Sequence, residues 1–215
     1  ALLVVWYHVF EGYAFAGGTL IESINHGYLA VDFFFILSGF VIGYAYDDRW
    51  GKSLTVKNFF KRRLIRLHPM VVMGAVLGVI TFCIQGSEQW DGTHVATSMV
   101  MWALLFAMFF IPAYPGAGYE VRGNGEMFPL NGPSWSLFFE YIGNILYALF
   151  VRKFNKVALS VLVFVAGCFT VYRCLTAPAG DIVGGWALNW EQQYVGMVRL
   201  MYPFFGGLLL SRLGW

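Results

Sequence analysis

Charged residues are scarce in this chain: Asp, Glu, Lys and Arg together make up 12% of its 215 residues, against about 25% in an ordinary soluble domain. With 59% hydrophobic residues, the chain has too little charge to cover the surface of a water-soluble globule. This composition argues against a soluble enzyme, a nucleic-acid-binding domain and a disordered regulator. The net charge of +2 indicates no particular partner.

Three long stretches contain no charged residue at all, and about 20 apolar residues are enough to cross a bilayer. These stretches lie between residues 66 and 88, 91 and 120, and 156 and 173. The chain is therefore predicted to be an all-α, polytopic integral membrane helical bundle. The expected spans are 1–16, 27–46, 69–86, 95–112, 132–151, 156–175 and 195–212.

Cysteine is also rare. Cys83, Cys168 and Cys174 show no CxxC spacing and lie in hydrophobic stretches, which argues against a disulfide framework or a zinc site. No other set of residues has the spacing of metal ligands, so we expect no metal centre.

Glycines occur at helical spacing within the predicted spans. Gly39 with Gly43, and Gly74 with Gly78, form two GxxxG pairs. Such pairs allow the backbones of neighbouring membrane helices to approach closely, so we expect helix contacts at both places.

The ends of the sequence suggest a piece of a longer protein. The chain begins at Ala1 without Met, and its first 16 residues would extend about 24 Å as a helix, short of a hydrocarbon core of about 30 Å. It stops at Trp215, directly after a predicted span. We expect 1–215 to be a single transmembrane domain that is truncated at both ends.

Basic residues in short loops predict the orientation of the spans. Seven of the 14 Lys and Arg residues lie between Arg49 and Arg66, so segment 47–66 is expected in the cytoplasm. Glu22 precedes this segment, and Glu88 and Asp91 follow it; both flanking loops are expected to face outward.

A second basic group conflicts with this simple topology. Arg152, Lys153 and Lys156 should also be cytoplasmic, yet three predicted spans separate them from segment 47–66, and an even number is needed. Either one stretch is re-entrant, or 112–131 contains an extra partial crossing, or the second group breaks the rule. Irregular backbone is expected in the Pro- and Gly-rich region 112–133, where it must be buried in protein or line a polar cavity.

Ionisable residues inside the predicted spans are costly in hydrocarbon and indicate function. His8 and Glu11 are three residues apart, so they share one helical face. Glu11 could bind one imidazole nitrogen and leave the other as a base that activates a hydroxyl. The alternative is a histidine near the membrane interface that contacts only water.

Arg63 and Arg66 are also three residues apart, in the run KRRLIRLHP that precedes the third predicted span. Paired guanidinium groups on one helical face suit phosphate groups. The alternative is that these arginines only set the topology, because any cytoplasmic loop is expected to be basic.

Two carboxylates and one further arginine complete the charged groups within predicted spans. Glu140 lies about 9 Å into a helix that Pro133 and Ser134 open. There it needs a proton or a cation, and Arg199 is one candidate; a structural ion pair is the alternative to a catalytic role. Asp32 either caps the second predicted helix, the commoner fate, or binds a positive group.

Four segments, taken together and in order, resemble the membrane-bound acyltransferase family 3, which includes O-acetyltransferases of O-antigen, peptidoglycan and exopolysaccharide. The second and fourth segments are fairly specific, and the resemblance weakens after about residue 155. The segments are His8 in the first span, VDFFFILSGFVIG from Val31 to Gly43, the RxxR run ending in Pro69, and NGPSWSLFFE from Asn131 to Glu140.

The resemblance implies about ten spans, of which about seven are present here, in a bacterial inner membrane. It also implies an acyl-CoA donor, most often acetyl-CoA, that arrives from the cytoplasm, and a glycan or lipid-linked sugar acceptor on the outer side. We expect a cell-envelope enzyme that moves an acyl group from acyl-CoA to a hydroxyl, with no metal and no nucleic-acid partner.

The resemblance assigns roles to nine residues. His8 is expected to be the general base, polarised by Glu11; a covalent acyl-histidine remains open. Glu140 joins these two as a catalytic residue, and Arg63 and Arg66 are expected to bind the phosphates of CoA. The predicted substrate-binding residues are Asp32, Ser134, Trp135 and Arg199.

Two other classes of function compete with this prediction. The charged residues could form the proton or ion path of a transporter or channel, although the chain lacks the inverted repeats that such proteins often carry. A structural membrane subunit would leave the intramembrane charges unexplained.

Overall fold

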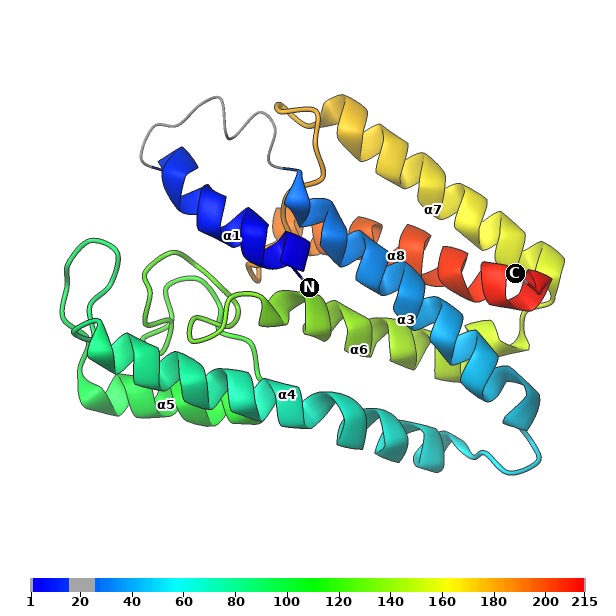
Figure 1. The fold of residues 1–215 in the computed structure, drawn as a ribbon, viewed down its shortest axis with the longest axis horizontal. Coiled ribbons are helices and arrows are strands. Elements are labelled where there is room, and N and C mark those ends of the chain that lie inside the picture. Colours follow the sequence, from blue (N-terminus) through cyan, green and yellow to red (C-terminus); the bar gives the residue numbers. More distant parts are fainter. Residues whose placement is uncertain (1, 16–25, 215) are drawn as a thin grey trace. The chain divides into compact units, whose positions relative to one another are not determined.

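The computed structural model describes residues 2–15 and 26–214, and for residues 11–15 it gives the helical backbone alone. In this part of the chain the protein is all-α, with seven α-helices (Figure 1), which confirms the predicted fold class. The helices are α1 (Leu2–Phe15), α3 (Ala30–Tyr46), α4 (Val56–Ile84), α5 (Thr97–Met108), α6 (Ser134–Leu149), α7 (Lys156–Thr176) and α8 (Trp190–Leu213).

The prediction of seven membrane spans is not confirmed. Over the described residues, four helical segments are long and apolar enough to cross a bilayer: Gly27–Arg49, Val56–Ile84, Lys156–Thr176 and Trp190–Leu213. The helices α1, α5 and α6 have 14, 12 and 16 residues. The shortest, α5, rises about 18 Å, too little for a hydrocarbon core of about 30 Å.

The chain folds as two compact units, each assembled from separate parts of the sequence. The first contains Ala1–Asp47, Phe154–Val183 and Arg199–Trp215, and therefore α1, α3, α7 and most of α8. The second contains Asp48–Lys153 and Gly184–Val198, and therefore α4, α5, α6 and the first residues of α8.

In the first unit, glycines bring α3 and α8 into backbone contact. A Cβ atom at Gly39 would overlap the backbone carbonyl of Phe204, and one at Gly207 would overlap that of Ile36. Gly43 in turn lies against the Ser211 side chain. The helix contact expected at the first GxxxG pair is confirmed, since only glycine permits so close an approach.

In the second unit, α4 begins at Val56 and not near residue 69, where the third span was expected to start. Thr55 caps it, since the Thr55 Oγ1 accepts a hydrogen bond from the Asn58 N–H (3.2 Å). The helix continues through Pro69, as membrane helices often do when neighbouring groups satisfy the freed backbone. The basic run is therefore helical, and the 29 residues of α4 extend about 43 Å.

The second GxxxG pair packs against a segment of irregular backbone and not against another helix. A Cβ atom at Gly78 would overlap the Leu130 carbonyl, and one at Gly74 would overlap the Asn131 side chain. The Pro- and Gly-rich segment before α6 therefore packs directly on α4. Its backbone groups find partners within the unit: the Met127 N–H donates to the Trp186 carbonyl (2.7 Å), as burial at membrane depth requires.

Contacts at the end of α4 show that α5 and the segment after it fold back to the same end of this helix. The helix α5 packs beside α4 (Figure 1). The chain then returns to the loop between them, where the Trp90 N–H donates to the Arg122 carbonyl (3.1 Å) and Arg122 Nη1 to Gln85 Oε1 (3.0 Å). The region predicted to hold irregular backbone does so.

The helix α6 then runs back toward the basic end of the second unit. The Trp50 Nε1–H donates to the Tyr147 hydroxyl (2.9 Å), and the Arg152 guanidinium lies 4.2 Å from the centre of the Trp50 ring. Within this unit, Arg152 therefore lies beside the start of the first basic group. Of the three alternatives for the topology, we propose the re-entrant stretch.

This topology predicts the labelling of single cysteines placed at Lys52, Glu88 and Lys153, all exposed, in a protein freed of its own cysteines. A membrane-impermeant maleimide added to intact cells should label the Glu88→Cys variant at once. It should label Lys52→Cys and Lys153→Cys only after permeabilisation. Labelling of Glu88→Cys and Lys153→Cys from the same side would contradict the re-entrant arrangement.

Candidate active site

The first unit contains a buried arginine held by a carboxylate. Arg199 is 2% exposed, and its Nη2 and Nε lie 2.8 and 3.3 Å from the two carboxylate oxygens of Asp32. The same Nη2 donates to the Tyr28 carbonyl (2.7 Å). Asp32 lies in the first turn of α3 but does not cap it; of the two alternatives, it binds a positive group.

The helix α1, which carries His8, contacts Tyr28 through the Tyr7 ring. The His8 ring lies edge-on to the Tyr7 ring with centroids 5.1 Å apart, and Tyr7 lies edge-on to Tyr28 at 6.3 Å. His8 itself is exposed. Asp32 and Arg199 thus lie together beside Tyr28, while His8 lies on the helix whose Tyr7 contacts Tyr28. Glu11 belongs to α1, but its side chain lies outside the described residues.

The second unit contains another buried pair, Arg63 with Glu140. Arg63 Nη2 lies 2.6 Å from Glu140 Oε1, and the two side chains are 2% and 18% exposed. Glu140 was expected to need a cation, and Arg199 was one candidate; the structure gives Arg63 instead, while Arg199 binds Asp32. Breaking such a pair on one side typically costs about 3–5 kcal/mol, because it leaves a buried charge uncompensated.

Two polar residues beside this pair were not predicted. Asn144 is 1% exposed and donates from Nδ2 to the backbone carbonyl of Glu140 (2.6 Å). Over the described residues, the buried Asn144 Oδ1 and the buried Tyr141 hydroxyl have no hydrogen-bond partner. Asn144 lies four residues after Glu140 and so shares its helical face, which is the sequence signal that could have identified it.

The remaining predicted residues of the second unit differ in exposure. Arg66 is exposed, because the buried stripe of α4 follows Phe59, Arg63 and Leu67 at steps of four residues. The two arginines therefore have different environments despite their helical spacing. Ser134 is 4% exposed at the start of α6, and the Trp135 ring packs on that of Phe139 at 6.1 Å.

The predicted site residues thus form two sets, one in each unit. The first contains His8 on α1 and the buried Arg199–Asp32 pair; a histidine is a residue type that can transfer protons to or from a hydroxyl. The second contains a buried pair on α4 and α6 near an exposed basic surface. Within residues 2–15 and 26–214, no group of three His, Cys, Asp or Glu side chains could hold a metal ion.

Comparison with known proteins identifies the family of the chain. An acyltransferase domain family, acyltransferase family 3, matches residues 1–215. The chain is 34% identical over 128 residues to "Protein 2 in picA locus" of Rhizobium radiobacter, covering 56% of this chain and 64% of that protein. It is 29% identical over 167 residues to "Acyltransferase MdmB" of Streptomyces mycarofaciens, covering 73% of this chain and 38% of that protein.

The chain therefore spans less than two thirds of the length of these two relatives. No solved structure matches it. The family match extends over the whole sequence, including the segments that contain His8, Arg63 and Glu140. The chain belongs to acyltransferase family 3, a family of acyltransferase domains, and is an integral membrane protein.

Proposed function

We propose that the protein transfers an acyl group, most simply acetyl, from acyl-CoA to a hydroxyl of a glycan or lipid-linked sugar. The observation that carries the proposal is the family match over the whole chain. The buried Arg63–Glu140 and Arg199–Asp32 pairs support it, because charges are retained within membrane segments chiefly where function needs them.

The proposed chemistry needs one base and one thioester. The His8 imidazole takes the proton of the acceptor hydroxyl, and the oxygen attacks the carbonyl carbon of the thioester. Collapse of the tetrahedral intermediate breaks the C–S bond, and the proton then passes from His8 to the CoA thiolate. An ester and free CoA result. In this proposal Glu11 holds the imidazole in the productive orientation.

Arg63 and Arg66 both lie on α4 but differ in burial, which supports a different role for each. Arg66 is exposed, so we assign it to the phosphate groups of CoA, which guanidinium groups bind well. Arg63 is 2% exposed and paired with Glu140, so we assign it to fixing that carboxylate at the catalytic centre.

The four predicted substrate-binding residues also differ in burial, and this difference supports different roles for them. Arg199 and Ser134 are buried, so we assign them to positioning their neighbours and not to direct contact with the acceptor. Asp32 and Trp135 are half-buried and remain proposed contacts. Family membership favours this enzyme over the transporter alternative, because the family is one of acyltransferases.

Replacement of His8 tests the base. In full-length protein at matched abundance, His8→Ala should lower acyl transfer from labelled acetyl-CoA to membrane glycan about 10²–10⁴-fold, the usual contribution of a general base. His26→Ala provides a control, because His26 is an exposed histidine whose ring lies 6.0 Å from that of Tyr28. Normal turnover by His8→Ala would remove His8 from the mechanism.

Replacement of both members of the buried pair separates stability from catalysis. Arg63→Met or Glu140→Leu alone should lower the stability of the protein by about 3–5 kcal/mol, whereas the double variant should regain much of it. Thermal unfolding of purified protein measures this. We expect the double variant to remain inactive; recovery of acyl transfer together with stability would show that the pair is only structural.

Replacement of Arg66 tests the donor site. Arg66→Ala should raise the KM for acetyl-CoA about tenfold, equivalent to about 1.4 kcal/mol, because a guanidinium–phosphate contact is lost. Arg62→Ala is the matched control, since Arg62 is a neighbouring exposed arginine on α4. An equal effect of the two substitutions, or an unchanged KM, would leave Arg66 a topological determinant only.

A further inference from the structure

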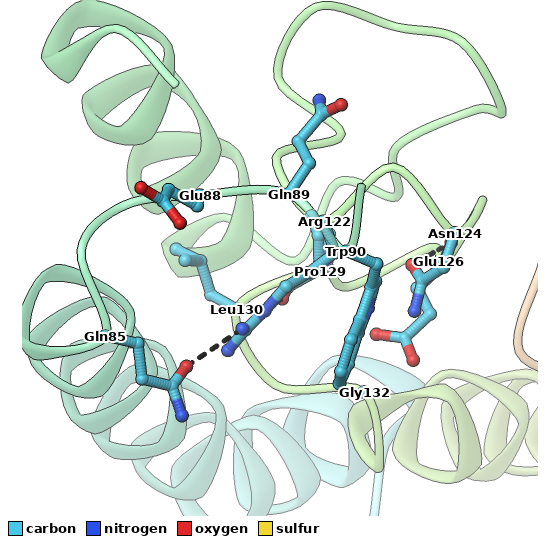
Figure 2. Close-up of a pocket in the computed structure, with 10 residues that line it drawn as sticks. All are labelled: Gln85, Glu88, Gln89, Trp90, Arg122, Asn124, Glu126, Pro129, Leu130 and Gly132. Carbon is cyan, nitrogen blue, oxygen red and sulfur yellow. Dashed lines mark hydrogen bonds between the residues drawn. The ribbon is translucent and has the colours of Figure 1, made fainter. Parts of the chain in front are cut away.

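A pocket of about 410 Å³ opens in the second unit, at the end of α4 opposite to the basic run. Its volume lies within the range of about 300–1,000 Å³ typical of small-molecule sites. None of the residues assigned above lines it. Figure 2 shows its walls, which are formed by Gln85, Glu88, Gln89, Trp90, Arg122, Asn124, Glu126, Pro129, Leu130 and Gly132.

One wall is a loop that is closed by hydrogen bonds between its own residues and carries a tryptophan. The Gln89 N–H donates to the Thr93 carbonyl (2.9 Å), and the Val95 N–H donates to the Ser87 carbonyl (2.8 Å). The Thr93 N–H also donates to Asp91 Oδ1 (2.9 Å), which lowers the pKa of that carboxyl. Trp90, at the tip, is 75% exposed. The loop thus holds a large, flat apolar surface at the pocket.

A fixed arginine forms the second feature. Arg122 Nε donates to the Pro129 carbonyl (3.2 Å), its Nη1 donates to Gln85 Oε1 (3.0 Å), and its guanidinium lies 4.8 Å from the centre of the Phe82 ring. Over the part of the chain that the structure describes, its Nη2 has no hydrogen-bond partner. The guanidinium is therefore held in one place with donor capacity left for a ligand.

The opposite wall carries a carboxylate and an amide. A Cβ atom at Gly132 would lie 3.0 Å from Glu126 Oε2, so the carboxylate lies directly against this glycine. The Asn124 Oδ1 accepts from the Glu126 N–H (3.4 Å). Figure 2 shows the Trp90 indole between the Arg122 and Glu126 side chains in this view. Gly132 leads directly into α6, which carries Glu140.

This combination favours an uncharged, polyhydroxylated ligand. A phosphate or carboxylate ligand would meet two carboxylates, Glu88 and Glu126, against one guanidinium. A purely apolar ligand would remove water from the polar side chains that line the pocket, at a cost in free energy. A sugar satisfies both requirements, because its hydroxyl groups both donate and accept hydrogen bonds while the C–H face of its ring packs on an aromatic side chain.

We propose that this pocket binds the sugar moiety of the acceptor, with Trp90 as the packing surface and Arg122, Gln85 and Glu126 as hydrogen-bonding groups. The inference rests on the proposed function, which requires an acceptor on the outer side. The pocket lies at the non-basic end of α4, which the positive-inside rule places outside.

Binding of simple glycosides to full-length protein in lipid nanodiscs tests the proposal. Saturation-transfer NMR with methyl glycosides of glucose, galactose, mannose and rhamnose should detect at least one of them. Trp90→Ala should weaken that binding at least tenfold, and Trp90→Phe should retain most of it. Trp102→Ala is the control, because Trp102 is 51% exposed on α5 and does not line the pocket.

Three results would overturn the proposal: no binding of any of the four glycosides, binding unchanged in Trp90→Ala, or equal loss in Trp102→Ala. Acetyl-CoA binding to the same nanodiscs separates this inference from the proposed function. Donor binding without glycoside binding would reject the pocket alone, whereas glycoside binding without donor binding would reject the proposed donor and retain the pocket.

Discussion

The structure depends on one constraint: in hydrocarbon, every charge and every backbone polar group needs a partner inside the protein. Arg63 and Arg199 are each 2% exposed and each bound to a carboxylate. These pairs connect elements that are far apart in the sequence, since their members are 77 and 167 residues apart. The same groups that we propose for the chemistry therefore also hold the helices of each unit together.

The constraint on the backbone explains the position of the glycines. At Gly39 the missing side chain admits another helix, whereas at Gly74 and Gly78 it admits the irregular segment before α6. A helix satisfies its own backbone, but an irregular segment at membrane depth needs neighbours that lie close enough to exclude lipid. Both kinds of contact use the same sequence signal, so GxxxG alone does not distinguish them.

The sequence predicted well those helix bounds that depend on neighbouring residues alone, such as a capping residue followed by an apolar run. The bounds of α7 agree closely with the expected span 156–175, because Asn155 caps the helix and an apolar run follows. The start of α4 differs from the expected span 69–86, because the helix begins at Val56 in the basic run and continues through Pro69. The partner of Glu140 was missed because its pairing with Arg63 spans 77 residues, and one sequence carries no signal for such a contact.

The deep start of α6 changes the level at which Glu140 lies in the bilayer. Asn131 packs on Gly74, ten residues or about 15 Å before the outer end of α4, so α6 begins well below the outer surface. Glu140 then reaches Arg63, which is only about 10 Å from the basic end of α4. With the basic end of α4 in the cytoplasm, as we propose, the pair lies in the inner leaflet, and the proposed thioester donor has only a short apolar path to travel.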